Sequence, residues 1–78
     1  KNYKNEEKEY ILRVENIKEY EGYSTFLASV KNVNGNVFNE KFKAYYSGRE
    51  PLNNFDTIKV SAKLEDIRIN ANAWRQLQ

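Results

Sequence analysis

A strict alternation of apolar and polar residues over positions 57–64 constrains the fold more than any other feature of the chain. The even positions are isoleucine, valine, alanine and leucine, and the odd positions are threonine, lysine, serine and lysine. Successive side chains of a β-strand point to opposite faces, so this period of two predicts a strand with one buried face. Its inward row is Ile58, Val60, Ala62 and Leu64.

A second strand is predicted from Glu9 onward, with the same period. Its inward residues are Tyr10, Leu12 and Val14. The alternation slips at Asn16, because Ile17 takes the place of an even-numbered apolar residue, and this slip predicts a bulge or bend in the strand. Residues 19–22 then predict a turn, in which Gly22 supplies the backbone freedom.

The next two segments form a predicted hairpin. Residues 23–33 and 37–46 both alternate, and the dipeptide Asn34-Gly35 between them tolerates the positive φ angles of a type I′ turn. The inward residues are Phe26, Ala28 and Val30 on the first segment and Phe38, Glu40, Phe42, Ala44 and Tyr46 on the second. The second segment therefore has one polar residue, a glutamate, in an otherwise apolar inward row.

The remaining segments have weaker patterns. Residues 47–56 contain a glycine, a proline and two adjacent asparagines, which predicts a loop. Ile67 and Ile69 are spaced for a short further strand, and residues 71–77 are expected to form one or two turns of helix around Trp74. We expect the tryptophan ring to cap the open end of the barrel.

This order of elements predicts a mainly β fold. A bent first strand, a tight hairpin, a long loop and a fourth strand are typical of a small OB-like Greek-key barrel, here with four clear strands and an incomplete fifth. SH3-like barrels and simple β-meanders give similar alternation at this length. We expect residues 1–8 to be a flexible lead-in and residues 9–78 to form a single OB-like β domain.

The residue types that are missing narrow the function. The 78 residues include no cysteine, histidine or methionine, which excludes disulfides, zinc-finger ligation and Ser-His-Asp or Cys-His catalysis. Glu65 and Asp66 are adjacent on a predicted extended segment, so their carboxylates would point to opposite faces and could not share a proton or a metal. We therefore expect a binding or assembly module that is not an enzyme and takes no metal or small-molecule cofactor.

The predicted outer face of the hairpin is basic and aromatic, which favours nucleic acid as a partner. Lysines neutralise phosphates and tyrosine rings stack on bases. Residues 41–78 carry seven basic and four acidic side chains, whereas residues 1–40 carry six basic and seven acidic ones. The basic bias is therefore modest. Binding of single-stranded DNA should accordingly be weak and salt-sensitive. The candidate nucleic-acid-binding residues are Tyr23, Lys31, Lys41, Lys43 and Tyr45, with Arg49 as an outlying helper from the loop.

One stretch also resembles a known family. The sequence Leu-Asn-Asn-Phe-Asp-Thr-Ile-Lys-Val-Ser-Ala-Lys-Leu over 52–64 resembles a segment of OB-fold domains, in particular the extracytoplasmic N-terminal OB domain of the ComEC family of DNA-internalisation channel proteins. The hairpin over 23–46 fits that family, and Asn-Ala-Asn-Ala-Trp over 70–74 is similar to its "Asn-Pro-Gly-aromatic" stretch.

The resemblance implies a setting for the domain. It would lie outside the cytoplasmic membrane, attached to the remainder of a polytopic membrane channel protein, and would contact incoming single-stranded DNA as an accessory module. The chain itself has no apolar run of the ~18 residues that a membrane span needs, so we expect it to be soluble.

Two alternatives belong to other classes. The same barrel could be a protein-interaction or assembly module, with a contact patch formed by Tyr20, Tyr23, Leu27 and Tyr45. It could also be a generic cytosolic OB protein. Salt separates nucleic-acid binding from an apolar contact, because only the former weakens steeply as the salt concentration rises.

Overall fold

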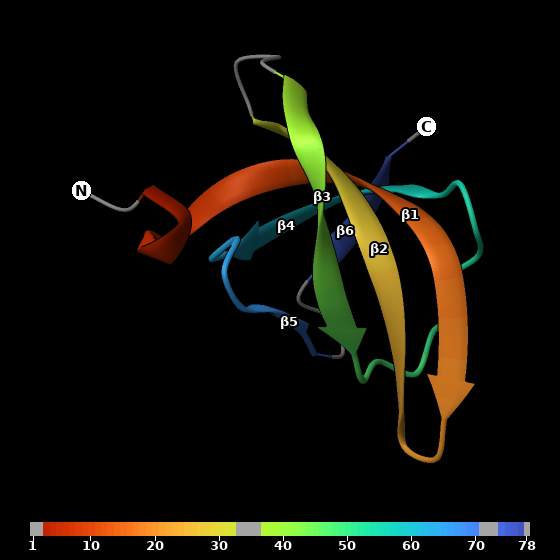
Figure 1. Cartoon of the computed structure of the whole chain (residues 1–78). Helices are drawn as coiled ribbons and strands as arrows, with labels where there is room; N and C mark the ends of the chain where they lie inside the picture. The colour runs from red at the N-terminus through yellow and green to blue at the C-terminus, as the bar shows by residue number, and fades with distance from the viewer. Residues whose placement is uncertain (1–2, 33–36, 71–73, 78) are drawn as a thin grey trace.

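The computed structural model describes residues 3–32, 37–70 and 74–77, and most of this part of the chain is in β-strands (Figure 1). A short 3-10 turn, η1, precedes the strands. The elements are η1 (Tyr3–Asn5), β1 (Lys8–Tyr20), β2 (Tyr23–Asn32), β3 (Val37–Tyr46), β4 (Thr57–Ala62), β5 (Ile67–Ile69) and β6 (Trp74–Leu77). The expected mainly β fold is confirmed, with six strands where four and an incomplete fifth were expected.

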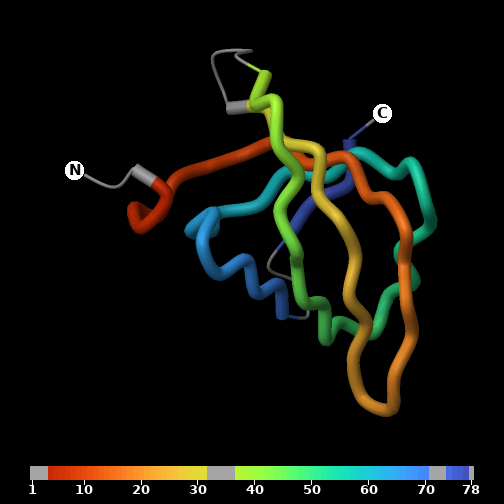
Figure 2. The backbone as a smooth tube through the Cα atoms, viewed as in Figure 1, coloured from red at the N-terminus to blue at the C-terminus, as the bar shows by residue number. Residues whose placement is uncertain are grey.

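The strands form one curled sheet in the order β5-β3-β2-β1-β4-β6. Strands β1, β2 and β3 are antiparallel neighbours, and β4 returns after the long loop to pair with the other edge of β1. That is the Greek-key order, and the tube in Figure 2 shows the sheet wrapping around itself. Strand β5 then pairs in parallel with β3. The fold is a small OB-like Greek-key barrel.

The core lies inside this curl and consists of the inward rows that the alternation predicts. Six of its residues are completely buried: Leu12, Val14, Ala28, Ala44, Ile58 and Ile67. Ile67 and Ile69 of β5 both point inward, which confirms the short strand expected there. Glu40 is an exception, because its side chain is exposed and its Oε1 lies 2.8 Å from Lys4 Nζ. Glu40 therefore lies outside the buried core although it stands in the even-numbered row, and an exposed position with a cation nearby avoids burying a charge.

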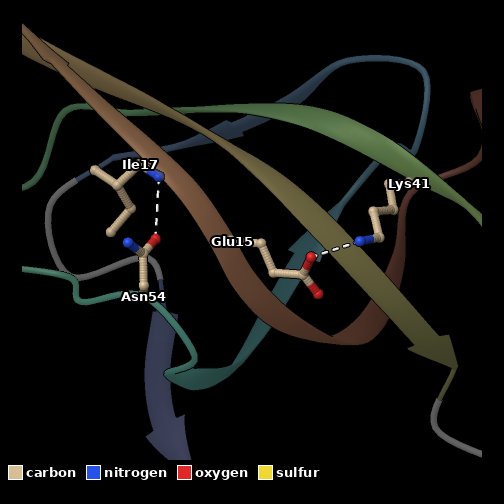
Figure 3. A network of polar contacts seen from close by, with 4 residues as sticks. All are labelled: Glu15, Ile17, Lys41 and Asn54. Carbon is tan, nitrogen blue, oxygen red and sulfur yellow. Dashed lines mark hydrogen bonds and ion pairs between the residues drawn. The ribbon is translucent and has the colours of Figure 1, made fainter.

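A β-bulge bends β1 where the alternation slips. The register with β2 shifts between Glu15 and Lys18, and Asn16 has a positive φ of 52°. The backbone N–H of Ile17 is freed from the ladder there and donates instead to Asn54 Oδ1, 3.0 Å away (Figure 3). The predicted bulge is confirmed, and the loop before β4 satisfies its unpaired donor.

The C-terminal segment corrects the sequence interpretation. Residues 74–77 do not form the expected helical turns; they form strand β6, which pairs antiparallel with β4 from Thr57 to Val60. The free edge of β4 offers a row of backbone hydrogen-bonding groups, and pairing with it outweighs the weak helical pattern of so short a segment. The part of the expected helix over 71–73 lies outside the described residues, as does the Asn34-Gly35 turn.

The Trp74 ring packs against the core, as its expected role as a cap requires. It meets Tyr46 edge to face with ring centroids 6.0 Å apart. Tyr46 is on β3 and Trp74 is on β6, near opposite ends of the sheet order, so this contact spans the seam of the curled sheet. In the described part of the chain, one isolated bridge between Lys63 and Asp66 also links the end of β4 to the start of β5.

The N-terminal residues contact the barrel. The backbone N–H of Glu65 donates to the carbonyl oxygen of Lys4 at 3.0 Å, and Lys4 also pairs with Glu40. Strand β1 begins at Lys8, one residue before the expected start. No helix in the described residues is long and apolar enough to cross a membrane.

The burial pattern of β4 gives a direct test of the fold. Replacing Ile58 by alanine should lower the free energy of unfolding by about 2–5 kcal/mol, because the side chain is fully buried and the change leaves a cavity. Replacing its neighbour Lys59, whose outward Nζ lies 3.6 Å from Glu9 Oε1, should cost about 1 kcal/mol or less. Urea unfolding followed by circular dichroism measures the free energy of unfolding of both variants. Equal losses would contradict the prediction that Ile58 points inward and Lys59 outward.

Candidate nucleic-acid interface

The outer face of β2 and β3 gathers most of the sequence-predicted site residues. The register places Thr25 opposite Tyr45, Leu27 opposite Lys43 and Ser29 opposite Lys41. Because directly paired residues lie on the same face of a sheet, the odd-numbered residues of both strands form one surface outside the barrel. Strand β1 adds its own outward residues on one side, and β5 adds Arg68 beside Tyr45 on the other.

Two exposed tyrosines lie at one end of this surface. Tyr20 and Tyr23 flank the two-residue turn at Glu21 and Gly22, where Gly22 has a φ of 86°. Their rings are stacked with centroids 5.0 Å apart and an interplanar angle of 14°, and the two residues are 50% and 43% exposed. Such a pair presents a flat aromatic surface to the solvent on which a nucleobase can stack.

Two cations lie next to this pair, around a third tyrosine. Lys43 Nζ lies 5.5 Å and the guanidinium carbon of Arg68 4.9 Å from the centroid of the half-buried Tyr45 ring. Arg68 also pairs with Asp66, with Nε and Oδ1 2.9 Å apart. Tyr45 therefore positions two cations on the face, and its own ring is less accessible for stacking than those of Tyr20 and Tyr23.

A pocket of about 300 Å³ opens beside the same tyrosine. It is lined by Tyr23, Tyr45 and Arg68 together with the chain that leaves β3 and β5. At its rim Ser47 Oγ lies 3.1 Å from Asn70 Oδ1. The pocket gives this end of the face a concave region with aromatic and cationic walls.

Lys41 differs from the other predicted lysines because its charge is already paired. Its Nζ lies 2.5 Å from Glu15 Oε1, and the ion pair reaches from β3 across β2 to β1 (Figure 3). The Glu15 side chain is only 20% exposed. An anion approaching Lys41 would have to compete with this carboxylate, so the charge of Lys41 is less available than that of Lys43.

The last two predicted residues lie apart from the tyrosines. Lys31 is exposed at the far end of β2 and has no ion-pair partner among the described residues. Arg49 lies in the loop after β3 and lines a different pocket, with Glu19 and the inward-facing Ser24 among its neighbours. The structure thus brings Tyr23, Lys43 and Tyr45 together and leaves Arg49 outside the face.

Sequence reasoning missed two cations of this surface. The bulge at Asn16 inserts one extra residue, so that the even-numbered side chains of β1 beyond it point outward. Lys18 therefore pairs with Thr25 and joins the outer face. Arg68 stands between the two inward isoleucines of β5 and therefore points outward. The sequence contains a signal for each cation. The slip of the alternation at Ile17 indicates the outward position of Lys18, and the spacing of the two isoleucines indicates that of Arg68. We call the set Lys18, Tyr20, Tyr23, Lys43, Tyr45 and Arg68 the basic-aromatic face.

Compared with protein-family models, with curated proteins and with solved structures, the chain gives no match.

The bulge that aims Lys18 and Tyr20 outward can be tested through its hydrogen bond. Replacing Asn54 by alanine should lower the free energy of unfolding by about 1–2 kcal/mol, because the backbone N–H of Ile17 loses its acceptor. Asn54→Asp keeps an acceptor oxygen and should lose less. Thermal or urea unfolding of the parent, Asn54→Ala and Asn54→Asp measures these differences in stability. An alanine variant as stable as the parent would show that this hydrogen bond does not hold the bulge.

Proposed function

We propose that the domain binds single-stranded nucleic acid, with DNA as its natural ligand, through the basic-aromatic face, and that it does so without catalysing a reaction. The observation that carries the proposal is the stacked, exposed pair of Tyr20 and Tyr23 beside three cations on the same surface. Stacking on aromatic rings contributes ~1–3 kcal/mol per base, and it requires bases that are not already stacked in a duplex.

Two cations of the basic-aromatic face are not held in ion pairs within the described part of the chain. Lys18 has no ion-pair partner among the described residues, and Lys43 interacts there only with the ring of Tyr45. Both are therefore available to phosphate oxygens without breaking an ion pair. With so few cations the electrostatic contribution is small, so we expect micromolar or weaker affinity that falls as the salt concentration rises.

We further propose, from the resemblance of residues 52–64, that the domain is an extracytoplasmic accessory module of a polytopic DNA-uptake protein in the cytoplasmic membrane. An antibody raised against the domain should then label source cells whose outer layers are removed and whose cytoplasmic membrane is intact. Labelling only after that membrane is permeabilised would contradict this setting.

The face can be tested by removing two of its cations. The double variant Lys43→Ala, Arg68→Ala should weaken binding of a fluorescently labelled oligothymidylate about tenfold or more at low salt, because two phosphate contacts are lost. The measurement is fluorescence anisotropy at several salt concentrations.

A matched control removes the same charge elsewhere. Lys59 of β4 and Arg75 of β6 are directly paired on neighbouring strands outside the face. The double variant Lys59→Ala, Arg75→Ala should bind nearly as well as the parent. Equal weakening in both variants would show that only the net charge matters. Binding to a protein partner that is indifferent to salt, with no binding of DNA, would instead favour an assembly module that uses Tyr20, Tyr23, Leu27 and Tyr45.

Breaking the ion pair between Lys41 and Glu15 should strengthen DNA binding, whereas removing Lys43 and Arg68 should weaken it. Glu15→Gln should strengthen DNA binding by a few-fold and steepen the dependence of log K on log salt by about 0.7, because Lys41 becomes free to neutralise one more phosphate. The same anisotropy titration measures both quantities. Unchanged affinity and slope would place Lys41 outside the DNA contact.

A further inference from the structure

A second aromatic side chain is exposed on the outside of the barrel, away from the tyrosines. Phe55 lies in the loop before β4 and is 66% exposed. Its φ of 73° lies in the left-handed region, which is unfavourable for a bulky side chain and costs nothing for glycine. A large apolar residue that is both strained and exposed contributes little to the core, so its position calls for another explanation.

The backbone around Phe55 is held firmly by β1. Strand β4 pairs with β1 only as far as Arg13 and Thr57. Beyond that point the loop takes over this edge: Val14 N–H donates to the Asp56 carbonyl at 2.9 Å, and Phe55 N–H donates to the Val14 carbonyl at 2.6 Å. These bonds fix the unusual conformation and hold the ring out over the sheet.

The surroundings of the ring are basic. The guanidinium carbon of Arg13 lies 5.1 Å from its centroid, and both residues line a pocket of about 450 Å³. Lys31, Ser29 and Thr57 line the same pocket, and none of the described residues that line it is acidic. An aromatic ring, two cations and two hydroxyls are the groups that bind a nucleobase with its phosphate.

This pocket is continuous with the basic-aromatic face. Its residues Ser29 and Lys31 are odd-numbered residues of β2, in the same outward row as Tyr23 and Leu27. Lys31 lies eight positions after Tyr23 along the strand, or about 26 Å at ~3.3 Å per residue. That length suits several nucleotides of an extended single strand, within the ~4–16 that one OB-fold occupies.

We propose that Phe55, with Arg13 and Lys31, forms a second base-stacking site, and that one single strand runs along β2 from Tyr23 to this site. The inference rests on the proposed function and extends it by placing the two ends of the strand. Arg13 and Lys31 contact phosphates, and the Phe55 ring stacks on one base.

Glycine is the informative substitution, because it removes the ring and fits the backbone conformation without strain. Phe55→Gly should keep a melting temperature within about 4 °C of the parent. It should weaken binding of an oligothymidylate of about twelve nucleotides fivefold or more, and binding of one of about four nucleotides at most about twofold, because the shorter strand does not need both sites. Phe55→Leu should weaken the longer oligonucleotide similarly, and Phe55→Tyr should bind it about as well as the parent.

The outcomes separate this inference from the proposed function. If Phe55→Gly and Phe55→Leu bind the longer oligonucleotide as tightly as the parent, while Lys43→Ala, Arg68→Ala binds it weakly, the second site is wrong and the basic-aromatic face stands. If the parent binds neither oligonucleotide, both proposals are overturned.

Discussion

The structure depends on one strand, β1, being paired along both of its edges. Residues 10–20 pair with β2, and residues 8–13 pair with β4 on the other side. Strand β4 returns to β1 after the β2–β3 hairpin, and in the curled sheet the inward rows of these four strands meet in one core. A chain of this size buries only about 60% of its unfolded surface, so the curling of this sheet around its inward rows is what makes a core possible.

The same strand also positions the proposed binding surface. The loop over 53–56, directly before β4 begins, continues along the edge of β1 through backbone and asparagine hydrogen bonds. The bulge at Asn16 turns Lys18 and Tyr20 outward, and the loop presents Phe55. The tyrosine pair and the phenylalanine thus lie near opposite ends of β2, with the Lys41–Glu15 ion pair crossing the strand between them.

The sequence predicted those parts of this arrangement that depend on whether a strand's side chain points into the barrel or out of it. Alternation identified the core rows of β1 to β4, the slip at Ile17 identified the bulge, and the outward positions of Tyr23, Lys43 and Tyr45 followed from parity. It did not predict β6, because the pairing of 74–77 with β4 is a long-range contact that local propensity does not contain. Nor did it show that Glu15 neutralises Lys41, since that pair requires three strands to be placed side by side.

The most direct test of the account is a titration of the ¹⁵N-labelled domain with oligothymidylate, followed by amide chemical shifts. We predict that the amides that shift most lie in the outward row of β2, at Tyr20 and Lys18, at Lys43 to Tyr45, and around Phe55. Shifts concentrated on β4 and β6, or no shifts at millimolar domain with the fold intact, would contradict binding of single-stranded DNA along this face.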